Sequence, residues 1–410
     1  MYNARYLLNG RVVCGLDGIS QAELTIAYEA KERPRCMCVR GGAEMYIAKH
    51  ARYVIKRMPG TAPQHHPSCD SFEPEANVSG RGAMLGTAIV STGPESFEVH
   101  VDFPLARTSG RIRTVPQSRE GSDVNMPAPR LTLQALMHFL FEQAGFHRWS
   151  PSMAGRRSQG VVHKYLTVAA SEVRIKGGCL GERFYFPEPF DERLKADIAA
   201  RRNSRFALLQ QRWNDNRREL AIVIGEFKDV SENAGTVRLR IKHMTDAPLI
   251  MDSKLWQKAR RKFEWMFDLA ATDTCDHLRI VMCLLIYAKQ EHVLHVDTAT
   301  CMLTSKNWIP LDAAFETELA AKLTEEGRRF LKPLRYGAKP SEPFPNFLLL
   351  DTGSVPTPLF VLSGFMSKEA LVAKEKVIEH AGGGAWVWRT GEPIPSFPIA
   401  VSATSFAGTG

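Results

Sequence analysis

The 410-residue sequence predicts an α+β protein of several domains. Up to residue 103 the apolar residues alternate with polar ones, as they do in half-buried strands. From residue 131 they recur at helical spacing, and beyond residue 311 helical and strand-like stretches follow one another. We expect a β-rich N-terminal region (1–106), a linker (107–130), a helical unit (131–182), a mixed α/β middle region (183–310) and a C-terminal α/β domain (311–410).

Composition and charge limit the class of protein. The hydrophobic content of 44% and charged content of 24% are ordinary for a globular chain. The N-terminal stretch MYNARYLLNG lacks the apolar run of a signal peptide, and the longest apolar run, IVMCLLIYA (280–288), is shorter than the ~20 residues of a membrane helix. We therefore expect a cytoplasmic protein without a membrane partner. The net charge of +9 favours a polyanionic partner, nucleic acid above all.

The segment RCMCVRGGAEMYIAKHARYVIKRMPGTAPQHHPSC (35–69) gathers three cysteines and two adjacent histidines. In a reducing compartment such spacing indicates a metal site. Cys36 and Cys38 can supply two thiolates from one turn, and Cys69 pairs with His65 or His66. We take His65, because its spacing from Cys69 lets one turn present both side chains. Four protein ligands leave no position for a reactive water, so we expect a structural zinc.

Between the two ligand pairs, EMYIAK and YVIKRM are typical of two strands of a hairpin, and PGT supplies a break before the ligands return. The zinc would then clamp the open end of this hairpin. The alternative is a small core of three unligated cysteines, or Cys14 as a substitute ligand. Cations surround the hairpin, and those we expect to contact nucleic acid are Lys49, Lys56 and Arg57.

Residues 85–103 alternate around a turn and predict a second hairpin, and the Arg-, Ser-, Gly- and Pro-rich stretch 107–130 predicts a linker. LTLQALMHFLFEQAG (131–145) then predicts a helix that ends at its glycine. A second helix follows, with Arg156 and Arg157 near its start. The pair is either a helix-turn-helix reader of DNA or, as is more common, two packed helices.

The middle region mixes strands with basic helices. The stretch ARRNSRF predicts a helix whose Arg201, Arg202 and Arg205 either contact phosphates or form a solvated face. ELAIVIGEFKDV (219–230) predicts a strand, and its Glu226-x-Lys228 spacing is better explained by an exposed, salt-bridged strand end than by a nuclease motif. KLWQKARRKFEWMFDLA (254–270) predicts an aromatic core stripe with a basic opposite face.

Beyond residue 311 the pattern gives helix, strand, strand, helix, strand, which predicts a mixed sheet. This series resembles the PD-(D/E)XK restriction-endonuclease-like core, whose acids hold Mg²⁺ for phosphodiester cleavage. Here Pro345-Asn346 stands in place of Pro-Asp, and Phe360 stands where the next strand would carry an acid. The resemblance therefore implies a degenerate domain without catalysis. The alternative is a rearranged Mg²⁺ nuclease site that uses Glu316, Glu318, Asp351 and Lys374.

The whole chain also resembles the bacterial domain-of-unknown-function family eleven seventy-three. The resemblance is clearest in PRCMCV, EMYIAKH, YVIKRMPGT, HHPSC, WIPLDAAFETEL and RRFLKPLRY. It implies a setting among integrative and conjugative elements and no particular activity.

Together these observations predict a zinc-stabilised, nucleic-acid-binding accessory protein of a bacterial mobile element, without catalysis. The alternatives are the metal-dependent nuclease and an adaptor that binds a protein partner of a conjugation or replication apparatus.

Overall fold

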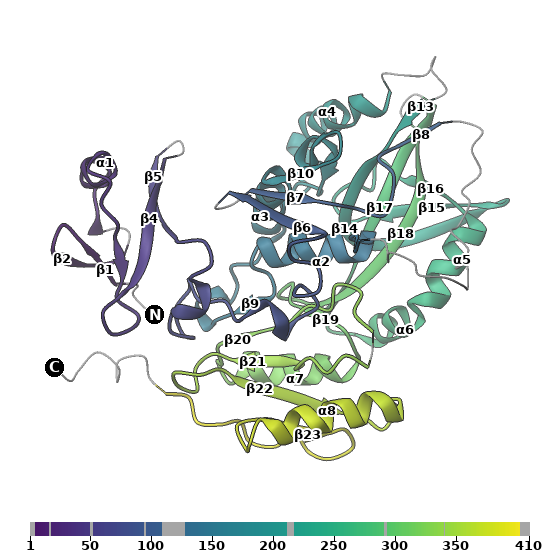
Figure 1. Ribbon diagram of the computed structural model, residues 1–410. Coiled ribbons are helices and arrows are strands. Elements are labelled where there is room, and N and C mark those ends of the chain that lie inside the picture. The colour runs from purple at the N-terminus through teal and green to yellow at the C-terminus, as the bar shows by residue number, and fades with distance from the viewer. Residues whose placement is uncertain are drawn as a thin grey trace, which may run out of the picture.

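The computed structural model describes residues 5–15, 18–49, 52–93, 96–108, 128–210, 217–290, 293–339 and 341–401. An N-terminal β-module lies to one side of a larger body, which contains a strand barrel, and the C-terminal sheet lies beneath (Figure 1). The predicted α+β class is confirmed. A search of the described helices finds none with the length and apolarity to span a bilayer.

The N-terminal module is an antiparallel five-stranded sheet in the order β2-β1-β3-β4-β5. Its elements are β1 (Arg5–Leu8), β2 (Arg11–Cys14), α1 (Gln21–Glu29), β3 (Arg35–Cys36), β4 (Ala43–Lys49) and β5 (Tyr53–Arg57). A capping box at Ser20 and Glu23 begins α1. The predicted hairpin is confirmed as β4 and β5, which alternate apolar residues inward because one face packs on the module core.

A second sheet has the order β11-β10-β7-β6. It consists of β6 (Ile89–Gly93), β7 (Ser96–Val99), β10 (Val173–Ile175) and β11 (Gly178–Cys179). The hairpin expected within 85–103 is confirmed as β6 and β7. The first expected helix is α2 (Leu133–Gln143), capped by Thr132 and followed by Gly145 at a φ of 75°. The second is α3 (Gln159–Ser171).

The connection between the two helices does not fit the helix-turn-helix alternative. Residues 144–158 separate α2 from α3 and include β9 (Arg148–Trp149) and the 3₁₀ turn η4 (Pro151–Met153), whereas the motif has a turn of 3–4 residues. Nearly every residue of α2 is buried, so this helix is a core element.

One hydrophobic core crosses the predicted domain boundaries. It collects side chains from within 88–103, 131–186, 220–224 and 281–285. Its strands come from regions far apart in sequence, such as β7 and β10, which pair in parallel. The boundaries in this part of the chain therefore do not separate independent cores. Most of the predicted linker, residues 109–127, lies outside the described residues.

Five strands close into a barrel in the order β14-β15-β16-β18-β17, with β17 pairing back to β14. The strands are β14 (Ala221–Asn233), β15 (Thr236–Ile241), β16 (Leu249–Asp252), β17 (Leu278–Gln290) and β18 (Val293–Ser305). All neighbours are antiparallel except β16 and β18. Between β16 and β17 come α5 (Ser253–Lys262) and α6 (Glu264–Thr272), whose expected stripe of Trp256, Phe263, Met266 and Phe267 packs into the barrel core.

The Glu226-x-Lys228 stretch is not an exposed strand end. Glu226 lies in the middle of β14 and is buried, and its carboxylate accepts hydrogen bonds from Lys242 (2.5 Å) and Arg279 (2.7 Å). The expected salt bridge is present, but it compensates a buried charge. Next to it Gly225 leaves space for Ile241, since a Cβ there would lie 2.4 Å from the Ile241 methyl.

The C-terminal sheet has the order β23-β22-β21-β20-β9, and only β22 and β23 are parallel. Its elements are α7 (Phe315–Glu325), β20 (Phe330–Leu331), β21 (Phe347–Leu349), β22 (Thr357–Leu362), α8 (Lys368–His380) and β23 (Trp386–Arg389). The predicted order and mixed sheet are confirmed, with β20 and β9 added. The remaining elements are β8 (Ala106–Thr108), β12 (Phe184–Tyr185), α4 (Lys195–Phe206), β13 (Arg217–Glu219) and β19 (Pro310–Leu311).

Acid should destabilise the core through His138 of α2. Its Nδ1 accepts a hydrogen bond from the Tyr336 backbone (3.1 Å), and burial lowers its pKa to about 4. The unfolded chain binds a proton at His138 below its pKa of about 6.5, whereas the folded chain binds it only near pH 4. The free energy of unfolding therefore decreases as the pH falls through this range, by up to about 3 kcal/mol. His138→Asn keeps an acceptor without the titration. In urea unfolding the variant should lose less stability than wild type between pH 7 and pH 4.5, and parallel pH profiles would contradict this.

Candidate metal centre

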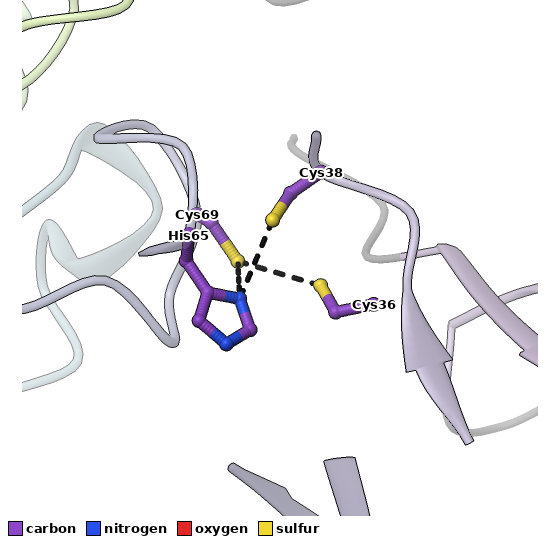
Figure 2. Close-up of side chains that lie close together, drawn as sticks. All are labelled: Cys36, Cys38, His65 and Cys69. Carbon is purple, nitrogen blue, oxygen red and sulfur yellow. Dashed lines mark hydrogen bonds between the residues drawn. The ribbon is translucent and has the colours of Figure 1, made fainter. Parts of the chain in front are cut away.

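Four side chains meet between the N-terminal sheet and the following loop (Figure 2). Cys36 ends β3, and Cys38 lies in the turn that follows. His65 comes directly after the 3₁₀ turn η2 (Ala62–Gln64), and a backbone hydrogen bond from Cys69 to His66 folds Cys69 back beside it. All four side chains are buried. The structure thus brings together the four residues expected as ligands, from two separate parts of the chain.

The donor atoms are spaced as around one tetrahedral ion. Cys36 Sγ lies 3.7 Å from Cys69 Sγ, and His65 Nδ1 lies 3.3 Å from Cys38 Sγ and 3.8 Å from Cys69 Sγ. Bonds of ~2.3 Å to sulfur and ~2.0 Å to nitrogen would give edges of about 3.8 Å between sulfurs and about 3.5 Å between sulfur and nitrogen. A disulfide, at ~2.05 Å, is excluded. The cluster could therefore hold a metal ion such as zinc.

Backbone donors point at two of the sulfurs. The His66 amide lies 3.5 Å from Cys38 Sγ, and the Ser71 amide lies 3.4 Å from Cys69 Sγ. Such N–H groups stabilise thiolates. His66 itself is turned to the backbone, since its Nδ1 accepts from the Ser68 amide (3.2 Å), which leaves His65 as the histidine of the cluster.

Without a cation the thiols cannot all ionise. Hydrogen bonds from Cys36 and Cys69 lower the pKa of Cys38, whereas hydrogen bonds with Cys38 and Cys69 raise the pKa of Cys36. Ionisation of one thiol is thus favoured, and ionisation of its neighbours is disfavoured, because like charges repel in a buried site. A divalent cation would remove this conflict, since it favours the thiolate form of every ligand.

The ligand loop is attached to the C-terminal sheet. Arg329 donates to the Ser68 carbonyl (2.8 Å), and Ser68 Oγ donates to the Leu350 carbonyl (3.0 Å). Arg148 donates to the carbonyls of Cys69, Asp70 and Phe72. Leu331, Leu348 and Leu350 share a hydrophobic cluster with Cys36, Cys38 and Cys69. The centre therefore joins the N-terminal module to the sheet formed near the other end of the chain.

Most of the cations expected to bind nucleic acid make contacts within the protein. Arg202 is buried against Asp246 (2.6 and 3.0 Å), and Arg201 pairs with Glu188 (2.6 Å). Arg57 pairs with Glu73 (3.2 Å), and Arg157 donates to backbone carbonyls of residues 145, 146, 148 and 307. Their first role is to hold the fold together. Arg205 is exposed and donates to the Gly181 carbonyl (3.1 Å), and Lys49 is exposed and lies over the Tyr53 ring (5.7 Å). Arg156 is exposed and Lys56 is half-buried.

A stronger group of cations lies on α5. Lys254, Lys258, Arg261 and Lys262 are exposed and share one face, opposite the buried Trp256 and Ala259. Within the described ranges none of the four pairs with a carboxylate. We call this group the α5 stripe. The sequence predicted a basic face on the stretch 254–270. The four residues of the α5 stripe were nevertheless not among the residues predicted to contact nucleic acid.

The residues of the nuclease alternative separate into three places. Glu316 of α7 accepts from the Asn346 amide (2.6 Å), and Lys374 of α8 donates to Asn346 Oδ1 (3.0 Å). Asp351 lies outside this group, held in a two-pronged ion pair by Arg328 (2.7 and 3.1 Å), and Glu318 is exposed. Among the described residues the cysteine–histidine cluster is the only group with metal-ligand spacing.

A buried lysine neutralises Glu316. The ammonium of Lys332 donates to Glu316 (3.0 Å) and Asp312 (2.6 Å), and all three side chains belong to the same buried network as Asn346 and Lys374. Burial acts to lower the pKa of Lys332, but the two carboxylates outweigh it and raise the pKa. The positive charge that Glu316 requires is thus part of the protein.

Comparison with known proteins identifies one relationship. A family model described as "Protein of unknown function (DUF1173)" matches residues 10–391. No curated protein and no solved structure matches the chain.

Metal content should depend on the cluster alone. We expect elemental analysis of purified wild-type protein to give about one zinc per chain, and Cys69→Ser to remove it together with several kcal/mol of stability, because metal binding is coupled to folding of the module. Cys14→Ser is the control, since Cys14 is exposed on β2. Wild-type protein without stoichiometric metal, or a metal content unchanged by Cys69→Ser, would contradict the assignment.

Proposed function

The chain belongs to the DUF1173 family, and we propose that it is a zinc-stabilised nucleic-acid-binding accessory protein of a bacterial mobile genetic element, without catalysis. Zinc is the ion we assign to the cluster, because three thiolates and one imidazole at tetrahedral spacing are its preferred closed set. Its role is structural, since four protein ligands leave no position open for a water nucleophile.

The α5 stripe is the observation that carries the proposal. Four cations at positions i, i+4, i+7 and i+8 present a row of positive charge along one side of a helix. Nucleic-acid phosphates are repeated single charges along a line, so a row of Lys and Arg side chains can neutralise several of them at once. Arg260, at the edge of the same helix, instead pairs with Asp268 (2.6 Å).

The remaining predicted contacts would extend this surface. Lys49 at the end of β4, Arg156 before α3 and Arg205 on α4 are exposed cations. Phosphate contacts of this kind position a nucleic acid without reading its sequence. The binding should therefore be electrostatic and sensitive to salt.

The C-terminal domain is proposed to be a degenerate restriction-endonuclease-like domain. The resemblance is supported by the contacts of Glu316, Asn346 and Lys374, which lie on α7, directly before β21 and on α8. Asn346 cannot supply a carboxylate, and Lys332 already neutralises Glu316. A hard dication would have to displace a buried ammonium to bind there.

Salt should weaken nucleic-acid binding steeply. If four phosphates are neutralised, the affinity for DNA measured by fluorescence anisotropy should fall about 50- to 150-fold between 50 and 200 mM salt. Lys258→Glu/Arg261→Glu should reduce the slope of log affinity against log salt by about 2. The control, Lys368→Glu/Lys376→Glu, makes the same charge change on the exposed side of α8 and should leave the slope in place. Equal losses in both variants would mean that net charge alone controls binding.

Incubation with Mg²⁺ or Mn²⁺ should produce no cleavage of plasmid or single-stranded DNA, because Lys332 occupies the position of the cation beside Glu316. Asp351→Ala should affect stability instead, since it leaves Arg328 buried without its partner. Cleavage that Glu316→Gln or Asp351→Ala abolishes, in protein that remains folded, would establish the nuclease alternative.

A further inference from the structure

The outer surface of the barrel carries a row of side chains that crosses all five strands. Strand register places Ser231 opposite Arg238, Arg238 opposite Ile250, Ile250 opposite His295, and His295 opposite Tyr287. We call these residues the barrel row. With strands ~4.8 Å apart, the row from Arg238 to Tyr287 is about 14 Å long.

The members of the barrel row point away from the barrel core. The residues directly before and after Arg238, Ile250, His295 and Tyr287 belong to the barrel core. They are Val237, Leu239, Leu249, Met251, Leu294, Val296, Ile286 and Ala288. Successive side chains of a strand alternate between its two faces, so the row lies outside. Arg238 is exposed, and Ile250, His295 and Tyr287 are partly exposed.

One end of the barrel row is a layered stack of flat groups. The rings of Tyr287 and His295 lie 5.6 Å apart at an interplanar angle of 26°. The guanidinium of Arg218, on β13, lies 5.5 Å from the centre of the Tyr287 ring. Rings and guanidinium planes that remain partly open to water at a protein surface are the groups on which unpaired bases stack.

Positive charge accompanies the stack. Burial lowers the pKa of His295, and the charges of Lys289 and Arg218 lower it further, so both cations are near this ring. Lys289 and Arg238 are exposed. Asp229 neutralises Arg240 in the next row (2.5 Å), which leaves Arg218, Arg238 and Lys289 as the cations along the barrel row itself. In the sequence the helix that carries the α5 stripe begins directly after β16, the strand of Ile250.

The connectivity of the barrel points to the same ligand. In chain order the barrel strands one to five are β14, β15, β16, β17 and β18. Strands one, two and three form a meander, and strand three pairs in parallel with strand five. Strand four pairs with strands five and one, and helices lie between strands three and four. This is the topology of the OB-fold, in which the face of strands two and three, with its flanking loops, binds oligonucleotides. A fold alone does not carry a function. In this barrel Arg238 and Ile250 lie on strands two and three, and the barrel row continues from them to the stacked rings of His295 and Tyr287 on strands five and four.

We propose that the barrel row, from Tyr287 through His295 to Arg238 and with Arg218 beside the Tyr287 ring, is a binding site for single-stranded nucleic acid. This rests on the proposed nucleic-acid binding and adds to it the strandedness of the ligand. Bases stack on the ring layer, and phosphates lie against Arg218, Arg238 and Lys289. A duplex keeps its bases stacked on each other, so it can use the cations but not the rings.

Anisotropy titrations of the full chain with a labelled thymidine oligonucleotide of about 16 nucleotides, the matching uridine oligonucleotide and a duplex of the same length would test the proposal. Wild type should bind the single strands more tightly than the duplex. Tyr287→Ala should weaken single-strand binding about tenfold or more and leave duplex binding nearly unchanged, whereas Tyr287→Phe should retain it. Arg238→Ala should reduce the salt slope by about 1.

Tyr165→Ala is the matched control, because Tyr165 is an exposed tyrosine that also has a cation, Lys164, over its ring (5.7 Å) but lies on α3. It should bind like wild type, and thermal unfolding of Tyr287→Ala checks that the barrel is intact. Equal affinity for single strand and duplex, or Tyr287→Ala with unchanged affinity, overturns the barrel row while nucleic-acid binding stands. Competition by polyglutamate as strong as by the oligonucleotide also overturns it. No binding to any nucleic acid overturns the proposed function itself.

Discussion

The pairing of β14 with β17 is the constraint on which the rest of the structure depends. Both strands are apolar on two faces: Val223 and Leu284 are partners that face the barrel core, and Ile222 and Leu285 are partners that face the core around α2. This one pairing closes the barrel and gives α2 a surface to cover. A buried strand of this kind has no free edge, so its register is set by packing on both sides.

The candidate metal centre provides a second constraint, near the N-terminal end of the chain. Its ligands come from β3 and from a loop some thirty residues later, and that loop is bound by Arg148, Arg329 and the backbone of Leu350. A bound ion would thus hold together the N-terminal sheet, the ligand loop and the C-terminal sheet.

Charge in this protein serves two purposes that the sequence does not distinguish. Arg157, Arg202, Arg328 and Lys332 satisfy carbonyls or carboxylates inside the fold, where loss of either partner would leave an uncompensated polar group. The α5 stripe and the cations of the barrel row face water and are available to phosphates. Net charge is the sum of both kinds, so a value of +9 says that a polyanion is favoured but not where it binds.

Local pattern determined much of the architecture. Alternation identified the hairpins β4–β5 and β6–β7, helical spacing identified α2, and cysteine spacing identified Cys36, Cys38, His65 and Cys69, because these signals lie within short stretches of chain. Tertiary structure alone decided that β17 returns to β14, that Arg202 is buried against Asp246, and that Tyr287, His295 and Arg238 share one face. Each of these depends on which distant strands become neighbours, and an arginine or a tyrosine has the same local pattern whether its neighbour is a carboxylate, a core or water.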